Sequence, residues 1–270
     1  MLVRVISAIV VIAIVLFCMV CNPVTRLFFI VAVSFMACYE MLNAIKKGGY
    51  KPLHWPAYVY TAGSAATIIC HVDTQWILLL LVLIVMAAFT QRCLRPTMTD
   101  RDLFASLAPI FYPLLLITII TQIIWENSEY WPMIFLLGVI AVVFCDSFAL
   151  FTGRAFGKHK MCPTISPKKT VEGLIGGMIF GTLSGLLVYF ALPLFGLKVL
   201  EIPFCMIAAF FASGIGVFGD LAASTVKREA GIKDYSKLIP GHGGILDRID
   251  SSIFAIPMVY VIFMIAQAVM

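Results

Sequence analysis

The chain alternates between long apolar blocks and short polar segments, and this pattern predicts its architecture. A helix needs roughly 20 residues to cross the hydrocarbon core of a bilayer, and lengths of about 17 to 25 are tolerated. We therefore expect nine transmembrane helices, at about residues 5–21, 24–45, 55–71, 75–90, 103–124, 132–152, 171–193, 199–221 and 252–270. The blocks lack the alternation of barrel strands. The predicted fold is all-α, a polytopic transmembrane helical bundle.

The composition agrees with a membrane location. Hydrophobic residues make up 62% of the chain and charged residues 12%, with a mean hydropathy of +1.04. Soluble domains carry about 25% charged residues, so these charges are too few to cover a water-soluble fold. No small-residue cleavage site follows the first block, so we expect it to stay as a helix rather than to be removed as a signal peptide. Most of the eight cysteines lie in apolar blocks, and no disulfide is predicted.

The basic residues fall on one side of the predicted bundle. Of the 19 Lys and Arg residues, only Arg26 and Lys198 lie on the other side. The positive-inside rule places the basic side in the cytoplasm. The amino terminus is then cytoplasmic, the carboxyl terminus is extracytoplasmic, and the protein is expected in the inner (cytoplasmic) membrane. The net charge of +5 reflects topology and attraction to anionic lipid, and no basic stripe with interleaved aromatics indicates nucleic-acid binding.

Two cytoplasmic segments, 153–170 and 222–251, are long and polar. We expect residues 1–130 to form N-terminal transmembrane helices and residues 131–270 to form a catalytic transmembrane region that carries these two segments. Within 171–193, a stripe of small residues recurs every four positions and allows another backbone to approach closely. This stripe predicts packing within the bundle or in a homodimer, and it consists of Gly173, Gly177, Gly181 and Gly185.

Acidic side chains inside apolar blocks are costly in a membrane and usually functional. The predicted topology brings six to the cytoplasmic third of the bilayer: Glu40, Asp146, Glu172, Asp220, Asp247 and Asp250. They would repel one another without a cation, and hard divalent cations bind carboxylate oxygens. The nearby basic residues exceed what acids alone require, and they are Arg154, Lys168, Lys169, Lys227, Arg228, Lys233 and Arg248. Acids, a cation and surplus bases together suit a triphosphate.

Two polar segments add candidate phosphate contacts. The stretch from Ser166 to Gly173 is predicted to start a helix, capped by Ser166 or Thr170 with Pro167 in its first turn, where an anion would be favoured. The alternative is a capped helix with two snorkelling lysines. Glycines around His242 allow close backbone approach to a ligand, and this histidine either donates to phosphate or is structural.

Spacing relates the remaining acids to their neighbours. Asp220 and Ser224 are four residues apart, so they share a helix face if the helix continues that far. Asp247 and Asp250 are three apart and share a face if they lie on one helix.

These residues carry a resemblance to the phosphatidate cytidylyltransferases (CDP-diacylglycerol synthases). The C-terminal signature reads Ser224-x-x-Lys227-Arg228-x4-Lys233-Asp234-x8-Gly243-Gly244-x-x-Asp247-Arg248-x-Asp250, with Pro240 and His242 between. Two upstream stretches are also similar to that family, Asp146-x-x-Ala149-x3-Gly153-Arg154-x-x-Gly157-Lys158 and Ser166-Pro167-Lys168-Lys169-Thr170-x-Glu172-Gly173. One departure is Leu150, where the family usually carries an aromatic residue. The N-terminal 130 residues match only as hydrophobic spans.

The resemblance implies that CTP and phosphatidic acid react to give CDP-diacylglycerol and pyrophosphate, with Mg²⁺ as cofactor and a second cation possible. Asp220 and Asp247 are expected to bind Mg²⁺, with Asp250 and Asp146 as further ligands. The expected catalytic residues are Asp220, Asp247, Lys227 and Arg248. The expected substrate-binding residues are Asp146, Arg154, Ser166, Lys168, Lys169, Glu172, Ser224, Arg228, Lys233, Asp234, His242, Gly243 and Gly244.

Three other functions fit parts of the pattern. A CTP-dependent polyprenol or phytol kinase would transfer the γ-phosphate to a neutral alcohol, but it should lack the full C-terminal signature. A transporter would favour inverted repeats and broken helices, which the sequence does not show. A membrane scaffold would leave the buried acids unexplained.

Overall fold

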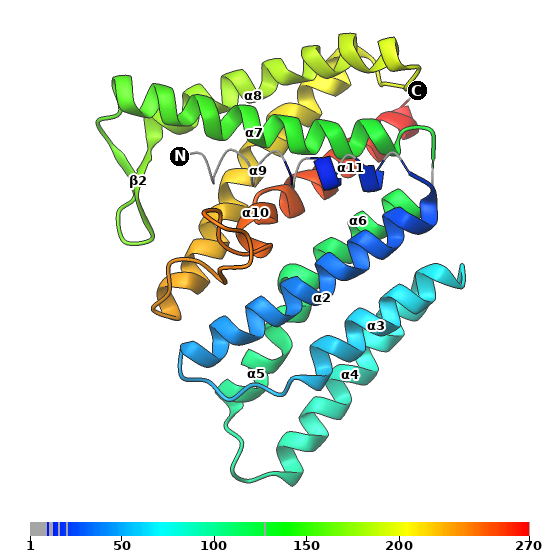
Figure 1. The fold of residues 1–270 in the computed structure, drawn as a ribbon, viewed down its shortest axis with the longest axis vertical. Helices are drawn as coiled ribbons and strands as arrows, with labels where there is room; N and C mark the ends of the chain where they lie inside the picture. Colours follow the sequence, from blue (N-terminus) through cyan, green and yellow to red (C-terminus); the bar gives the residue numbers. More distant parts are fainter. Residues whose placement is uncertain (1–9, 11–12, 16, 20, 127, 270) are drawn as a thin grey trace. The chain divides into compact units, whose positions relative to one another are not determined.

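The structure is a computed structural model that describes residues 10, 13–15, 17–19, 21–126 and 128–269. Among these described residues, seven helices are long and apolar enough to cross a membrane. The fold is therefore an all-α polytopic helical bundle, as the apolar blocks predict (Figure 1). About half of the first predicted span, 5–21, lies outside the described part of the chain.

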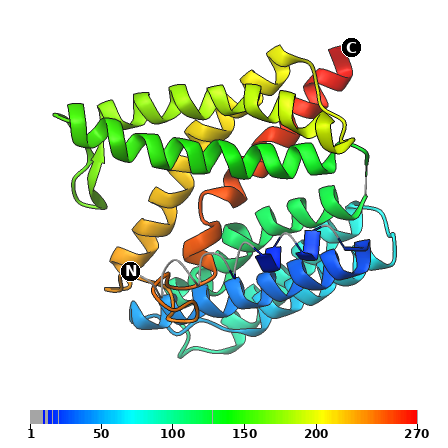
Figure 2. The same ribbon diagram turned by 45° about the horizontal axis from the view of Figure 1, so that its top comes forward.

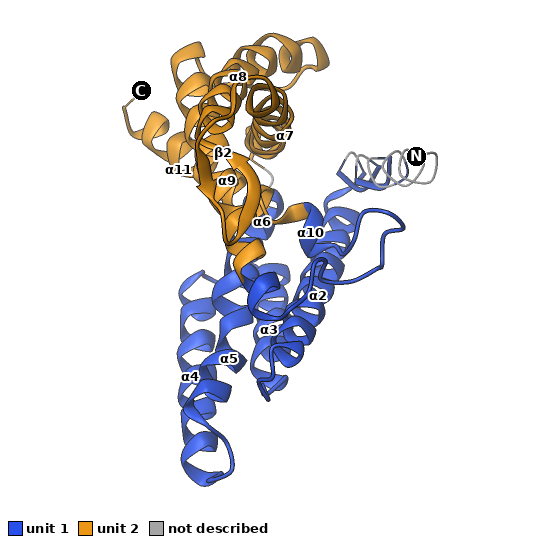
Figure 3. Cartoon of the chain, turned by 90° about the vertical axis from the view of Figure 1, so that its left-hand side faces the viewer, with its two compact units in different colours: residues 1–125, 226–248 blue, residues 126–225, 249–270 orange. Residues whose placement is uncertain are grey.

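The chain forms two compact units (Figure 3). Unit 1 comprises residues 1–125 and 226–248, and unit 2 comprises residues 126–225 and 249–270. The second long polar segment thus belongs mainly to unit 1, together with the N-terminal helices. The functional division expected at residue 130 stays a prediction.

Unit 1 is built on helices from the first half of the chain. They are α2 (Pro23–Lys47), α3 (Trp55–Ile69), α4 (Gln75–Leu94), α5 (Asp100–Pro109), the π-helical turn η1 (Ile110–Leu114) and α6 (Leu115–Trp125). The side chain of Asn22 caps α2 by accepting from the Thr25 N–H. Thr99 and Asp102 form a capping box that starts α5. With 15 residues, α3 is shorter than a typical span.

Unit 2 contains α7 (Trp131–Phe156), α8 (Val171–Ala191), the 3-10 turn η2 (Leu192–Phe195), most of α9 (Ile202–Glu229) and α11 (Ser252–Val269). The boundary between the units falls inside α9, after Thr225. Helix α8 runs alongside α7 (Figures 1 and 2). The segment of chain that connects α7 to α8 forms a small antiparallel hairpin of β1 (Lys160–Cys162) and β2 (Ser166–Thr170). The hairpin is a local addition to the predicted all-α fold.

The glycine stripe on α8 packs inside unit 2. A Cβ added to Gly177 would lie 2.6 Å from the Cys145 carbonyl oxygen of α7, and one added to Gly185 would lie 2.7 Å from the Cys205 carbonyl oxygen of α9. Such close approach to backbone is possible only without a side chain. The packing prediction is confirmed for these helices, whereas a homodimer stays a prediction.

The helices extend further into the polar segments than predicted. Helix α7 continues to Phe156, and α9 continues to Glu229, eight residues beyond the expected end at 221. The α9 sequence turns polar there but keeps good helix formers. The helix ends where Gly231 adopts a left-handed φ of +64° and the Ile232 N–H donates to the Lys227 carbonyl.

Candidate active site

The β1–β2 hairpin of unit 2 is fixed to the first turn of α8. The Thr170 hydroxyl accepts from the Gly173 N–H at 3.1 Å, which confirms the second of the two predicted caps. The other predicted cap is wrong, because Ser166 pairs with Cys162 in the hairpin and Pro167 follows it in β2, outside the helix. Strand pairing therefore uses the segment that the sequence assigned to the first helical turn.

Glu172 connects the same helix to the start of the hairpin. Its carboxylate accepts from the backbone N–H groups of Lys158 and His159 at 3.1 and 3.2 Å. The His159 ring Nδ1 lies 2.6 Å from Glu172 Oε1. In this arrangement Glu172 holds the hairpin, a role that sequence reasoning missed along with the contribution of His159. Proline at position 163 between two short segments was the available turn signal.

An acidic and basic cluster lies beside this hairpin within unit 2. The Lys169 ammonium is 2.7 Å from Asp220 Oδ2 and 3.4 Å from the Val217 carbonyl oxygen. Asp146 of α7 lines one pocket together with Lys169. Two of the predicted acids and one predicted base therefore come together from α7, β2 and α9.

A pocket opens next to this cluster and has a volume of about 170 Å³. Its polar lining includes Asp146, Lys168 and Lys169. The rest of the lining is mainly apolar and includes Leu150, the position that departs from the family pattern. Carboxylate, ammonium groups and apolar surface in one pocket suit an amphiphilic phosphate. Arg154, in the last turn of α7, is exposed.

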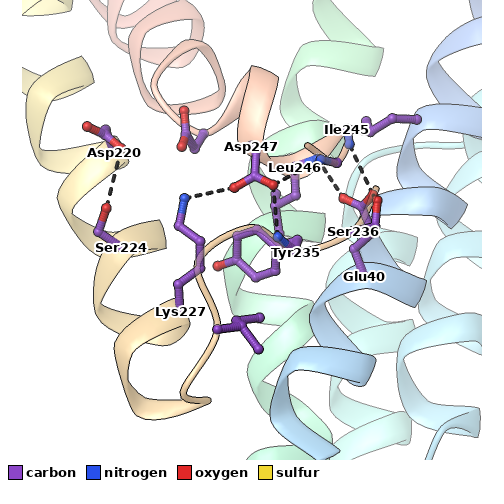
Figure 4. A network of polar contacts seen from close by, with 12 residues as sticks. Glu40, Asp220, Ser224, Lys227, Tyr235, Ser236, Ile245, Leu246 and Asp247 are labelled. Atoms are coloured by element: carbon purple, nitrogen blue, oxygen red, sulfur yellow. Dashed lines mark hydrogen bonds and ion pairs between the residues drawn. The ribbon is translucent and has the colours of Figure 1, made fainter. Parts of the chain in front are cut away.

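Helix α9 carries further site residues on one face. Ser224 Oγ donates to Asp220 Oδ1 at 3.5 Å, which confirms the expected shared face (Figure 4). Lys227 follows at the spacing of the next turn. The apolar block predicted that the helix ends at 221, next to Asp220. In the structure the helix continues to Glu229, so Asp220 lies within it.

In unit 1, Asp247 is the centre of a buried polar network (Figure 4). Its Oδ1 accepts from the Lys227 ammonium at 2.8 Å, and its Oδ2 accepts from the N–H groups of Tyr235 and Gly244 at 2.8 and 3.0 Å. The Lys227 ammonium also lies 5.4 Å from the centre of the Tyr235 ring. Both oxygens of this carboxylate are thus engaged by donors of the protein itself.

The glycine-rich segment explains how Asp247 reaches these donors. Gly243 has a left-handed φ of +86°, and a Cβ there would lie 2.8 Å from Asp247 Oδ2. The absence of a side chain at Gly243 therefore lets the backbone come close to the Asp247 carboxylate. Binding of a ligand by Gly243 and Gly244 stays a prediction.

The remaining predicted residues of unit 1 are mostly exposed. Arg228, Lys233, Asp234 and Arg248 are exposed, and His242 is half-buried. Arg228, Lys233 and Arg248 place positive charge along the polar segment 226–248, and their contact with a substrate stays a prediction. Asp250 belongs to unit 2 and is buried in the turn after α10 (Leu246–Ile249), so it does not share a helix with Asp247. Its Oδ1 accepts from the Ser251 N–H at 2.8 Å.

The acids divide by their capacity to hold a cation. Among the described residues, no group of three or more His, Cys, Asp or Glu side chains is arranged to hold a metal by itself. Both oxygen atoms of Asp247 accept from donors of the protein, and both oxygen atoms of Asp220 are engaged by Lys169 and Ser224, whereas Asp146 lines the pocket. Mg²⁺ typically uses one or two carboxylates and takes its other ligands from substrate phosphates and water. A cation can use Asp146 and Asp220 as such a pair only once Lys169 has left Asp220, and Mg²⁺ binding stays a prediction.

Comparisons with known proteins agree with the sequence resemblance. A sequence model described as "Cytidylyltransferase family" matches residues 2–266. The chain is similar to a protein of Aquifex aeolicus named "Phosphatidate cytidylyltransferase", with 39% identity over 163 residues that cover 59% of this chain and 56% of that protein. A protein of the same name from Haemophilus influenzae is 44% identical over 138 residues, 49% of this chain and 46% of its own length. The aligned part spans about half the length of these curated relatives.

Proposed function

Because the chain belongs to the cytidylyltransferase family, we propose that it transfers the cytidylyl group of CTP to phosphatidic acid. The products are CDP-diacylglycerol, an intermediate of phospholipid synthesis, and pyrophosphate. The observation that carries the proposal is the pocket of unit 2, where Asp146, Lys168 and Lys169 meet an apolar lining. Such a pocket suits the phosphate end of a lipid.

The chemistry requires positioning more than proton transfer. The phosphate of phosphatidic acid is already an anionic nucleophile at neutral pH. One of its oxygen atoms forms a bond to the α-phosphorus of CTP, while the bond from that phosphorus to the β-phosphate oxygen breaks and pyrophosphate leaves. Two anions must therefore be brought together and aligned.

Each unit carries basic side chains that we expect to attract phosphate groups. In unit 2 these are Lys168, Lys169 and Arg154, and in unit 1 they are Arg228, Lys233 and Arg248. Lys227 contributes indirectly, because its ammonium is held by Asp247 and fixes the segment that carries Arg248. Ser166, Ser224, Asp234, Glu172 and His242 remain predicted substrate contacts or supports of these groups.

Asp146 and Asp220 are the residues that would hold Mg²⁺. When bound, the ion supplies charge neutralisation for the triphosphate and the lipid phosphate. Asp247, in unit 1, and Asp250, in unit 2, stay predicted ligands from the sequence, and a second cation belongs to the same proposal. For Asp247 to bind a cation, the Lys227 ammonium must first give up its bond to Oδ1.

The proposed location follows from the distribution of charge. Nine spans place the amino terminus in the cytoplasm and the carboxyl terminus outside, with the active site at the cytoplasmic face of the inner membrane. CTP then arrives from the cytoplasm and the lipid from the inner leaflet. A homodimer is part of the proposal and is compatible with the many apolar side chains that the bundle exposes.

An assay with purified protein tests the reaction directly. With CTP labelled at the α-phosphate and phosphatidic acid as acceptor, label should enter the lipid fraction while pyrophosphate appears in equal amount. A γ-phosphate kinase would instead leave the α-label in the water-soluble CDP. Absence of label from the lipid would overturn the proposed function.

A further inference from the structure

Glu40 is a buried acid that the proposed chemistry leaves without a role. It lies on α2, in the N-terminal part of the chain, and its exposed fraction is 1%. Its Oε1 accepts from the Ser236 hydroxyl at 2.6 Å and from the Ile245 N–H at 3.0 Å. Its Oε2 accepts from the Leu246 N–H at 2.8 Å (Figure 4). The carboxylate is therefore bound at both ends of the glycine-rich segment 236–246.

Asp247 binds the same segment from its other side. Its Oδ2 accepts from the N–H groups of Tyr235 and Gly244, next to the donors that Glu40 uses. The two carboxylates thus alternate along the chain: one takes Tyr235 and Gly244, and the other takes Ser236, Ile245 and Leu246. All these residues belong to unit 1.

The residue at position 244 is matched to this arrangement. A Cβ on Gly244 would lie 2.4 Å from Glu40 Oε1 and 2.6 Å from Oε2. No real Cβ approaches an oxygen atom so closely, so a larger residue would push the Glu40 carboxylate away from the segment. The glycine of the C-terminal signature and the acid of α2 are therefore sterically coupled across about 200 positions of sequence.

We propose that Glu40 is a positioning residue for the cytidylyl transfer. It fixes the backbone at Ile245 and Leu246, which sets the direction of Asp247 and, through the ion pair, of Lys227. This inference rests on the proposed function, since it assigns Glu40 to the alignment of that reaction. A requirement of the C-terminal signature therefore lies in a helix of the N-terminal part, where the family resemblance extends only to the apolar spans.

Charge, and not only shape, is needed at position 40. Three donors meet two carboxylate oxygens. A glutamine has almost the same shape, but it offers one acceptor oxygen, and its amide group would face an N–H donor. Glu40→Gln should therefore release at least one backbone N–H of the segment. Glu40→Asp keeps the charge but withdraws the carboxylate by one methylene.

Two measurements on the purified full-length protein test the inference. In Glu40→Gln, hydrogen exchange should accelerate in peptides covering 236–247 and stay unchanged in those covering α3 and α4. The kcat should fall about 100-fold, as expected for reacting groups displaced by about 1 Å, with a smaller change in the KM for CTP. Ser34→Ala is the matched control on α2, because Ser34 donates only within its own helix, to the Ile30 carbonyl.

A double variant tests the coupling without relying on one substitution. Gly244→Ala alone should reduce kcat strongly, because its Cβ meets the Glu40 carboxylate. In Glu40→Asp with Gly244→Ala, the withdrawn carboxylate leaves room for that Cβ, so the loss should be at least about 10-fold smaller than the product of the two single losses. If Glu40→Gln does not fold, the inference is tested by this double variant and by Ser236→Ala, which removes one hydrogen-bond donor to Glu40.

The outcomes separate the inference from the proposed function. Faster exchange with an unchanged kcat in Glu40→Gln would overturn the positioning role. Unchanged exchange in the segment, or strictly multiplicative losses in the double variant, would overturn the contact on which it depends. Absence of cytidylyl transfer by the unmodified protein would overturn the proposed function itself, whatever the exchange data show.

Discussion

The Lys227 ammonium lies 2.8 Å from Asp247 Oδ1, and both side chains are almost fully buried. A buried ion pair is costly to form but more costly to break, because removal of one partner leaves the other charge without compensation. Here Asp247 also orders the backbone through two N–H groups. The pair therefore connects the end of α9 to the glycine-rich segment of the C-terminal signature.

Asp247→Asn should abolish cytidylyl transfer while the protein still inserts into the membrane. The buried ammonium of Lys227 loses its anion, and we expect a loss of about 3 kcal/mol in stability. Thermal unfolding in detergent and the α-labelled CTP assay measure the two effects. Asp100→Asn is the control, because it breaks an ion pair with Arg92 that is largely exposed and contributes at most about 1 kcal/mol. Near-normal turnover of Asp247→Asn would contradict its role.

Lys169→Met should reduce kcat/KM about 100-fold, comparable to the loss of one fixed donor in other active sites. The substitution removes the cation that lies between the Asp220 carboxylate and the pocket, so two acids are left together where a phosphate must bind. Initial rates at varied CTP and phosphatidic acid concentrations measure the effect. Lys160→Met, at an exposed position of the same hairpin, is the matched control. An equal loss in both variants would indicate a general effect of charge instead.

Removal of divalent cations should stop the reaction, and added Mg²⁺ should restore it. Asp220→Asn should then require a higher Mg²⁺ concentration for half-maximal rate, since one of two hard ligands beside the pocket is neutralised. Titration of the rate with Mg²⁺ in both proteins gives this shift. Asp73→Asn, at an exposed acid outside the site, should leave the titration unchanged. An unaffected rate in excess EDTA, or identical titrations for Asp220→Asn and the unmodified protein, would remove the metal from the proposal.

Local patterns predicted the parts of this structure that depend on local physics. The apolar blocks predicted most of the long helices within about four residues, with the end of α9 as the exception, and the spacing of Asp220 and Ser224 predicted their shared face. Thr170 was one of two candidate caps because both have the right side chain. The choice between them depends on pairing of Ser166 with Cys162, which the helix signal does not contain.

Contacts between distant residues could not be read in the same way. Glu40 was expected among the acids around a cation, but the structure gives its oxygen atoms to three donors more than 190 positions away. A lone acid in an apolar span signals that a partner exists without saying which one. Likewise, the glycines of the signature indicated a close approach, and the structure shows that carboxylates of the protein make it.

The glycine stripe of α8 allows a test in which available space decides the sign of the effect. An alanine is favoured over glycine inside a helix by about 1 kcal/mol. At Gly177, however, the new Cβ would lie 2.6 Å from the backbone oxygen of Cys145, and overpacking of this kind costs about 1 to 3 kcal/mol. At Gly214 on α9, its nearest contact is the flexible end of Met178, at 3.3 Å. Gly177→Ala should therefore lower the Tm in detergent, whereas Gly214→Ala should leave it unchanged or raise it. A stabilised Gly177→Ala would contradict the close packing of α7 and α8.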